Sequence, residues 1–128
     1  MKSDVPAGGP KVIITGFGSF ADIDVNPTQV LIDRLRQDQG KDDIYYEVLP
    51  VAVQDVDSFH AAVEGEILVF IHLGVHNAGT CISLERTAYN NMTFRFPDQH
   101  GFQPDGVCIS CDAMLDQPLH TSLPIGVL

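Results

Sequence analysis

The stretch from Lys11 to Thr28 constrains the fold of this chain more than any other. Its β-branched run, Val12 to Ile14, is typical of a strand covered on both faces. Gly16 and Gly18 allow a sharp turn at the carboxyl end of that strand. Asn26-Pro27 is a strong helix start, with Asn as the N-cap and Pro in the first turn. The stretch therefore predicts a buried strand, a tight turn and a helix, in that order.

The predicted turn carries two large apolar side chains, Phe17 and Phe20. In open α/β sheets, ligands bind in the crevice beyond the carboxyl ends of the strands. Two phenylalanines and two glycines at that edge predict the floor of a small apolar pocket.

Strand and helix patterns alternate along the first half of the chain. This alternation predicts an α/β fold with a parallel sheet and right-handed crossovers. The run ILVFIHL is the most strand-like in the chain, and we expect it at the centre of the sheet. The expected strands are Lys11–Thr15, Ile44–Val51 and Ile67–Leu73; the expected helices are Pro27–Gln37, with Val30, Leu31 and Leu35 on one face, and about Val53–Val63, with an apolar stripe of Val56, Phe59, Ala62 and Val63.

The second half of the chain gives weaker patterns. A loop with glycine and asparagine, Gly74 to Cys81, follows the third strand at the same sheet edge as the Phe17 turn. Ile82 to Phe96 predicts two short strands or an irregular arm, and Gln99 to Gly106 a turn-rich loop. Further short strands are expected at Val107–Ile109 and Leu119–Leu123.

Composition limits the classes of function. A length of 128 residues fits one domain, expected at residues 11–128 after a flexible leader at residues 1–10. The formal charge of −10 argues against a nucleic-acid or anionic-membrane partner, and no apolar run reaches the length of a membrane span. Three cysteines without an export signal predict reduced thiols and a cytoplasmic location.

Glu85 is the most suggestive titratable residue in the chain. It follows the Gly74–Cys81 loop, in a weakly charged segment next to Arg86. A carboxylate there could orient an imidazole, anchor a substrate amide or act as a base. The local pattern alone favours a solvated glutamate on a surface strand.

The cysteines give little evidence of chemistry by themselves. Cys81 has His76 nearby in sequence, but a loop cysteine without a role explains it better. Cys108 and Cys111 form one C-x-x-C pair, which is weak evidence for zinc or redox chemistry without a second pair. His72 could join His76 and Cys81 around a metal, but it more readily fits a hydrogen-bonded position within the sheet.

Six segments of the chain, taken together, resemble the pyroglutamyl peptidase I (pyrrolidone-carboxylate peptidase) family. They are GFGSF, VNPT, HLGV, SLERTAYN, FRFPD and SLPI, in the family's order and spacing, from about Lys11 to Ile125. The resemblance implies a three-layer α/β/α sandwich with a mostly parallel central sheet. It also implies hydrolytic removal of N-terminal pyroglutamate from peptides by a Cys-His-Glu thiol mechanism, with no cofactor and no metal.

The resemblance assigns roles residue by residue. Phe17 and Phe20 match the aromatic residues that enclose the flat pyrrolidone ring, and Phe96 matches a further apolar pocket position. Asn26 matches the asparagine that supports the turn near the substrate amide, and Arg95 an arginine associated with the substrate carbonyl. Glu85 matches the acidic member of the catalytic set. A small, flat, uncharged lactam suits a pocket of phenylalanines with a few polar groups.

Other parts of the family pattern are missing. The nucleophilic Cys of the family lies beyond the LPI segment, in a block resembling S-x-T-A-G-T-[FY]-x-C-N, and its catalytic His lies further on. Residues 1–128 contain neither block, and Val75 stands where the family often has a polar residue. We therefore expect a fold that is incomplete at the C-terminus, a truncated member of the family that does not hydrolyse by itself.

Two alternatives to an enzyme stay open. The chain could be a non-catalytic isoform or pseudoenzyme that binds pyroglutamyl termini or associates with itself through an exposed sheet. It could also be a fragment that barely folds, because a parallel sheet needs long-range pairing.

Overall fold

The computed structural model describes residues 12–38, 43–63 and 69–127. These residues form two compact units, which are described separately. The first unit holds the described residues up to Val75 together with Asp98–Phe102; the second holds His76–Pro97 and the described residues from Gln103. The predicted leader, residues 1–10, lies outside the described residues, and the single domain stays a prediction.

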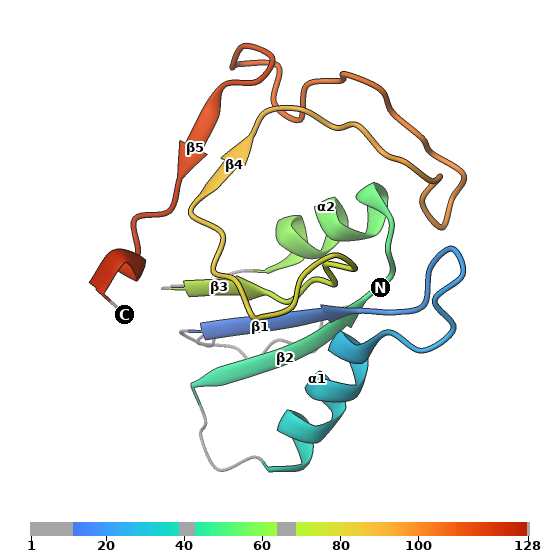
Figure 1. Cartoon of the computed structure of the whole chain (residues 1–128), viewed down its shortest axis with the longest axis vertical. Helices are drawn as coiled ribbons and strands as arrows, with labels where there is room; N and C mark the ends of the chain where they lie inside the picture. Colours follow the sequence, from blue (N-terminus) through green and yellow to red (C-terminus); the bar gives the residue numbers. More distant parts are fainter. Residues whose placement is uncertain (1–11, 39–42, 64–68, 128) are drawn as a thin grey trace. The chain divides into compact units, whose positions relative to one another are not determined.

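A parallel sheet forms the centre of the first unit (Figure 1). Its strands are β1 (Val12–Phe17), β2 (Ile44–Leu49) and β3 (Val69–His72), in the order β2-β1-β3. Val12 is in register with Ile44 on one side and with Val69 on the other. The α/β class and the parallel pairing predicted from the sequence are therefore confirmed.

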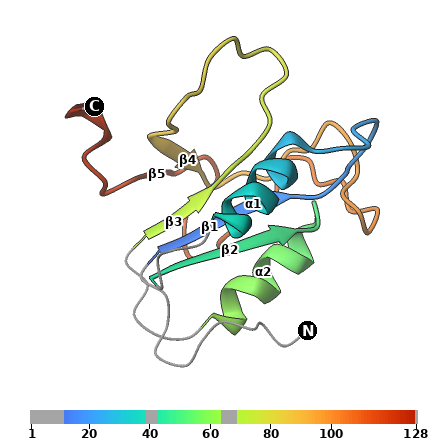
Figure 2. The ribbon, with the colours of Figure 1, turned by 90° about the horizontal axis from the view of Figure 1, so that it is seen from below.

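Two helices cover opposite faces of this sheet (Figure 2). α2 (Val53–Ala62) packs on the face that carries Ile13, where Ile13, Leu49 and Phe59 form the buried apolar core. α1 (Pro27–Gln37) packs on the face that carries Gly16. Because side chains alternate along a strand, residues 13 and 16 of β1 point to opposite faces. Helix, sheet and helix thus make three layers in this unit.

The expectation that Ile67–Leu73 forms the centre of the sheet is wrong for the described strands. β1 pairs on both sides, whereas β3 pairs with β1 alone. Ile71 is 40% exposed and His72 is also exposed. An apolar run predicts a strand, but its place in the strand order depends on crossovers that local composition does not encode. Ile67 and Leu68 lie outside the described residues.

α1 has the predicted bounds but not the predicted buried face. Asn26 caps the helix through a 3.0 Å hydrogen bond from the Thr28 amide. Val30 and Leu31, expected on the apolar face, are exposed, and the buried residues are Thr28 and Ile32. The face of α1 with Thr28 and Ile32 packs on the sheet, where the helix approaches the backbone of β1 closely.

That approach occurs at Gly16. A Cβ atom at this position would lie 2.7 Å from the Thr28 carbonyl oxygen and 2.9 Å from Ile32 Cγ1. Both distances are shorter than van der Waals contact allows. Gly16 is therefore needed for its lack of a side chain rather than for an unusual backbone angle.

The start of α2 is capped by a residue far away in sequence. Ala52 occupies the N-cap position and makes no side-chain cap hydrogen bond. Asp98, 45 residues further along the chain, accepts a hydrogen bond of 3.0 Å from the Val53 amide instead. A helix whose own sequence lacks a cap thus receives one through tertiary structure.

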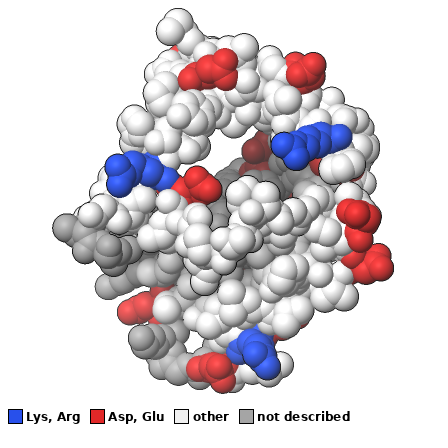
Figure 3. All heavy atoms as spheres, viewed as in Figure 1, with Lys and Arg blue, Asp and Glu red and all other residues white. Residues whose placement is uncertain are grey.

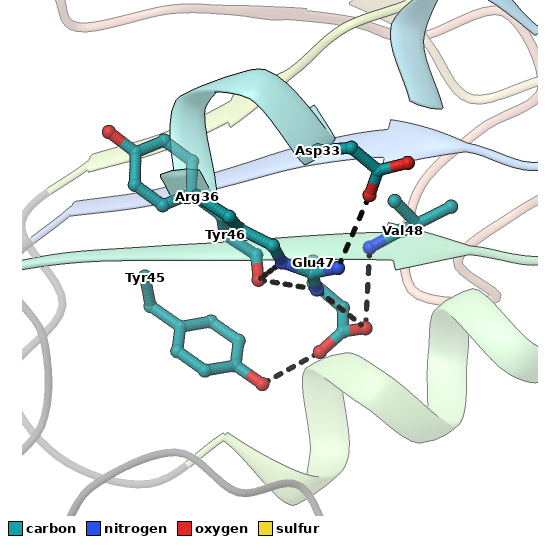
Figure 4. A network of polar contacts seen from close by, with 6 residues as sticks. All are labelled: Asp33, Arg36, Tyr45, Tyr46, Glu47 and Val48. Atoms are coloured by element: carbon teal, nitrogen blue, oxygen red, sulfur yellow. Dashed lines mark hydrogen bonds and ion pairs between the residues drawn. The ribbon is translucent and has the colours of Figure 1, made fainter. Parts of the chain in front are cut away.

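A polar network joins the end of α1 to β2 (Figure 4). The Arg36 guanidinium donates to the Tyr46 carbonyl oxygen, from Nη2 at 2.9 Å and Nε at 3.3 Å. It also lies 3.5 Å from Glu47 and 3.7 Å from Asp33. Tyr45 donates to the other Glu47 oxygen at 2.7 Å. These contacts fix the last turn of α1 against the outer strand.

The second unit contains a short antiparallel ladder and long irregular segments. β4 (Thr87–Tyr89) pairs with β5 (Pro118–His120). Most of Ile82–Phe96 is irregular, and the strand expected at Val107–Ile109 is a single bridge between Met92 and Val107. The strand expected at Leu119–Leu123 begins one residue earlier, at Pro118, and already ends at His120. A 3₁₀ turn, Ile125–Val127, follows. No helix in the described residues is both long and apolar enough to cross a membrane.

Asn90 is the polar centre of this second unit, and its side chain is only 9% exposed. Its Oδ1 accepts from the amides of Ile109 and Ser110, both at 2.8 Å. Its Nδ2 lies 3.0 Å from each of three carbonyl oxygens, those of Ser110, Ala113 and Met114. One side-chain amide therefore organises the loop from residue 109 to 114.

We predict that Gly16→Ala lowers the free energy of unfolding by about 1–3 kcal/mol, because the added methyl overpacks the contact between β1 and α1. Urea denaturation followed by circular dichroism measures this change. Gly18→Ala is the matched control, since the nearest atom to its Cβ is 3.9 Å away, and it should stay within about 0.5 kcal/mol of wild type. Equal unfolding midpoints for the two variants would contradict the close approach.

Candidate functional site

The turn after β1 holds both predicted pocket phenylalanines. Phe17 is the last residue of β1, and Phe20 lies three residues on; both are half-buried. Phe20 and Ile23 exchange two backbone hydrogen bonds, of 3.2 and 2.9 Å. Ala21, between them, has a φ of 49°, which is uncommon for a residue with a side chain. The structure thus brings Phe17 and Phe20 together on one small closed turn.

The start of α1 locks this turn through side chains. Asn26 is 2% exposed, and its Nδ2 donates to the Gly18 carbonyl oxygen at 3.0 Å. Its Oδ1 accepts from the amide and the hydroxyl of Thr28. Thr28 Oγ1 accepts from the Phe17 amide at 2.9 Å. Asn26 therefore supports the turn through its amide, and its contribution to substrate binding stays a prediction.

Two residues that the sequence interpretation missed also contact this part of the first unit. Gln99 donates from Nε2 to the Ser19 carbonyl oxygen at 2.8 Å and from its backbone amide to the Val51 carbonyl oxygen at 2.9 Å. Asp98 accepts from Val53 as described above. The Pro97-Asp98 turn in the sequence indicated a tight loop, but it held no information on where this loop docks.

The other predicted site residues belong to the second unit. Glu85 lies in the irregular segment before β4, and Arg95 and Phe96 lie before Pro97; all three are exposed. Gln103 donates to the carbonyl oxygens of Phe94 and Arg95, at 3.3 and 3.1 Å. The backbone beside Arg95 is therefore held within its own unit. The roles of Glu85, Arg95 and Phe96 therefore stay predictions.

His72 lies in the sheet and is hydrogen-bonded, as predicted. Its Nδ1 is 2.7 Å from Oγ1 of the buried Thr15. Its ring stacks on Phe70 with centroids 5.7 Å apart, and the His60 ring lies at 5.3 Å. Partial desolvation of the ring, and then the charge of His60, lower the pKa of His72 from its ordinary value.

Neither the cysteines nor the acidic and histidine side chains form a metal centre in the described part of the chain. Cys81 and Cys111 are exposed, Cys108 is half-buried, and all three thiols are free. Among described residues, no three His, Cys, Asp or Glu side chains are placed to hold one metal ion. The C-x-x-C loop is instead fixed by Asn90, which binds the two residues between its cysteines.

Charged side chains are spread over the face of the molecule that Figure 3 shows. On this face, acidic side chains are scattered over the surface and the basic side chains lie apart from one another.

The pKa of one acidic group, Asp98, is shifted by its surroundings. Desolvation would raise the pKa of Asp98, but hydrogen bonds from the Val53, Phe102 and His100 amides, with the charge of His100, outweigh it and lower that pKa.

Comparison with known proteins gives one consistent family. Residues 10–128 match the sequence profile of a family described as pyroglutamyl peptidase. The chain is 34% identical over 110 residues to a pyrrolidone-carboxylate peptidase of Thermococcus litoralis, a match that covers 82% of this chain and 49% of that protein. A pyrrolidone-carboxylate peptidase of Fusobacterium nucleatum is 31% identical over 121 residues, with 92% and 55% covered.

Solved structures agree with the sequence matches. The pyrrolidone carboxyl peptidase of Fervidobacterium islandicum superposes with a TM-score of 0.79 at 25% identity, covering 92% of this chain and 57% of that one. The enzyme of Thermococcus litoralis gives a TM-score of 0.76 at 32% identity, covering 92% and 54%. The chain thus spans about half the length of the relatives it matches.

We predict that the fold becomes less stable as the pH falls below about 6.5, the ordinary pKa of histidine. Because the pKa of His72 is lowered in the folded state, the unfolded chain binds more protons between that lowered value and 6.5. The free energy of unfolding therefore falls as the pH drops through this window. In His72→Asn, which keeps a polar group near Thr15 but does not titrate, the loss between pH 7 and pH 5 should be smaller.

An NMR titration of the His72 ring provides the direct check. Its midpoint should lie below 6.5 in the wild-type chain. His60→Asn should raise that midpoint because it removes a positive charge beside the ring. A wild-type midpoint at or above the ordinary value would contradict the assigned environment.

Proposed function

The chain belongs to the pyroglutamyl peptidase family, and from this premise we propose that it carries recognition residues for N-terminal pyroglutamate. Phe17, Phe20 and Phe96 enclose the flat pyrrolidone ring, Arg95 interacts with a substrate carbonyl, and Asn26 keeps the turn in shape. Aromatic side chains offer a lactam ring a large apolar surface with a defined geometry. Peptides with an N-terminal pyroglutamyl residue are the proposed substrates.

The observation that carries this proposal is the locked Phe17–Phe20 turn in a chain of this family. Thr28 holds the amide of Phe17, Asn26 holds the carbonyl of Gly18, and Gln99 holds the carbonyl of Ser19. These backbone groups are satisfied within the protein, so the backbone of the turn is held in shape without a ligand. A pocket wall built in advance loses less conformational entropy when a small ligand binds.

We propose that Glu85 serves as the acidic member of the catalytic set in the family reaction. In that reaction a cysteine thiolate attacks the carbonyl carbon of the pyroglutamyl residue, and a histidine transfers the proton to the leaving amine. The acid orients the histidine and stabilises its charged form. The exposed carboxylate of Glu85 is available for this contact.

Residues 1–128 by themselves should not perform the hydrolysis. The family places its nucleophilic cysteine and its histidine in blocks that these residues do not contain. Cys81, Cys108 and Cys111 are free thiols, and we assign the role of nucleophile to none of them. We propose the cytoplasm as the location, in keeping with reduced thiols.

We predict that the chain binds a pyroglutamyl dipeptide amide, and more weakly the glutaminyl analogue, but does not cleave it. Phe20→Ala should weaken binding about tenfold, because a stacking surface worth roughly 1–2 kcal/mol is lost. Val25→Ala is the matched control, since Val25 lies 69% exposed in the same loop. Chemical-shift perturbation by NMR measures the affinity of each variant.

The cleavage arm uses a fluorogenic pyroglutamyl amide with and without a thiol blocker. Activity that the blocker abolishes would mean that one of the three cysteines is a nucleophile, and the proposed division of roles would be wrong. If the chain alone is inactive, and joining a C-terminal half from a family member makes it active, the result would support the proposed roles of the pocket residues and of Glu85. A flat binding titration at millimolar peptide would reject the recognition role.

A second candidate function, a non-catalytic interaction module, is favoured by the second unit. Large apolar side chains are exposed there, including Ile82 at 98%, Met114 at 77% and Leu119 at 75%. Exposed apolar groups of this kind favour association. We propose that this unit pairs with a second copy of the chain.

We predict that the sedimentation coefficient of the chain rises with concentration, and that Ile82→Lys combined with Leu119→Lys abolishes the rise. Removing apolar area and adding like charges both oppose pairing of two copies. Val30→Lys, at a 46% exposed position of α1, should leave association unchanged. A concentration-independent wild-type value would exclude self-association.

A further inference from the structure

The segment Asp98–Phe102, here named the clasp, packs with the first unit although its neighbours on both sides belong to the second. Its contacts reach two separate parts of the first unit, the start of α2 and the turn after β1. Asp98 binds the first amide of α2, His100 Nε2 lies 2.6 Å from Oδ2 of Asp55, and Gln99 binds the carbonyl oxygens of Val51 and Ser19. The clasp therefore joins the start of α2 to the Phe17–Phe20 turn.

The clasp is itself a rigid turn. Asp98 Oδ1 accepts from the amides of His100 and Phe102, at 2.9 and 3.0 Å. The Asp98 backbone amide donates to the Phe102 carbonyl oxygen at 2.8 Å, and the Gly101 amide donates to Asp98. Gly101 has a φ of 82°, a conformation that glycine adopts without strain. These hydrogen bonds within the clasp hold the backbone around Gln99 in place.

The Phe17–Phe20 turn needs support from outside at Ser19. Ser19, Ala21, Asp22 and Asp24 are exposed, and the tip at Ala21 has an unfavourable backbone angle. Asn26 and Thr28 hold the beginning of the turn, at the Phe17 amide and the Gly18 carbonyl oxygen. Gln99 is the residue that reaches the carbonyl of Ser19, directly before Phe20.

We infer that Gln99 is a positioning residue, which fixes the Phe20 side of the turn through the hydrogen bond from its Nε2 to the Ser19 carbonyl oxygen. The inference rests on the proposed function for its consequence, because the turn is the wall of the proposed pyroglutamyl pocket. In the sequence, Pro97 alone separates the clasp from Arg95 and Phe96. Gln99 is therefore three positions away from Phe96 in the sequence.

Gln99→Leu tests this role, because leucine has a similar size but cannot donate. Without ligand, hydrogen exchange at the amides of Phe20 and Ile23, measured by NMR, should accelerate about fivefold, as expected for the loss of one typical hydrogen bond. Exchange in β1 and β2 should be unchanged. Gln99→Lys, which retains a donor, should restore slow exchange, and Gln54→Leu, at an exposed position of α2, is the matched control.

The second readout is affinity for the pyroglutamyl dipeptide amide. Gln99→Leu should raise the dissociation constant about fivefold, with the urea midpoint of the first unit unchanged. Unchanged exchange at Phe20 and Ile23 would overturn the inference. If exchange accelerates but the affinity for the peptide is unchanged, the inference that Gln99 positions the wall of the pocket is also overturned.

The failure of the proposed function is a separate result. If the wild-type chain does not bind the peptide, recognition is rejected. The exchange comparison, which needs no ligand, then still decides whether Gln99 holds the turn.

Discussion

The close packing of α1 against β1 at Gly16 is the constraint on which the candidate site depends. Because Gly16 lacks a side chain, the first turn of α1 comes near enough for Thr28 Oγ1 to accept from the amide of Phe17. The same approach lets Asn26 reach the carbonyl of Gly18. The helix start thus satisfies the backbone groups at the end of the strand, where Phe17 packs against the apolar core and Phe20 is half-buried.

The two units are stabilised in different ways. The first has an apolar core of Ile13, Leu49 and Phe59 between sheet and helix. In the second, the described residues that are buried are Asn90 and Pro104, and order depends on the hydrogen bonds of one amide. A buried amide is costly when unpaired and strongly orienting when fully paired. The first unit is therefore stabilised by hydrophobic burial, whereas the hydrogen bonds of Asn90 fix the arrangement of the loops in the second.

Local signals in the sequence predicted local features well. Asn26-Pro27 fixed the start of α1, and both of its predicted bounds agree with the structure. Period and composition did not predict its buried face, because Val30 and Leu31 are exposed and Thr28 and Ile32 are buried. A helical period says which residues share a side, whereas the partner surface decides which side is buried. Similarly, no signal near Ala52 indicated that α2 is capped by Asp98.

The sequence by itself determined the α/β class, the strand–turn–helix unit around Phe17 and Phe20, and the family to which the chain belongs. These follow from short-range patterns: β-branched runs, paired glycines and a capped helix start, with motifs in a fixed order. Only the tertiary structure decided that β1 is the middle strand of the three described, that Asp98 caps α2, and that Gln99 holds Ser19. Each of these links residues that are distant in the chain, and the free energy of such a contact depends on a geometry that only the folded backbone provides.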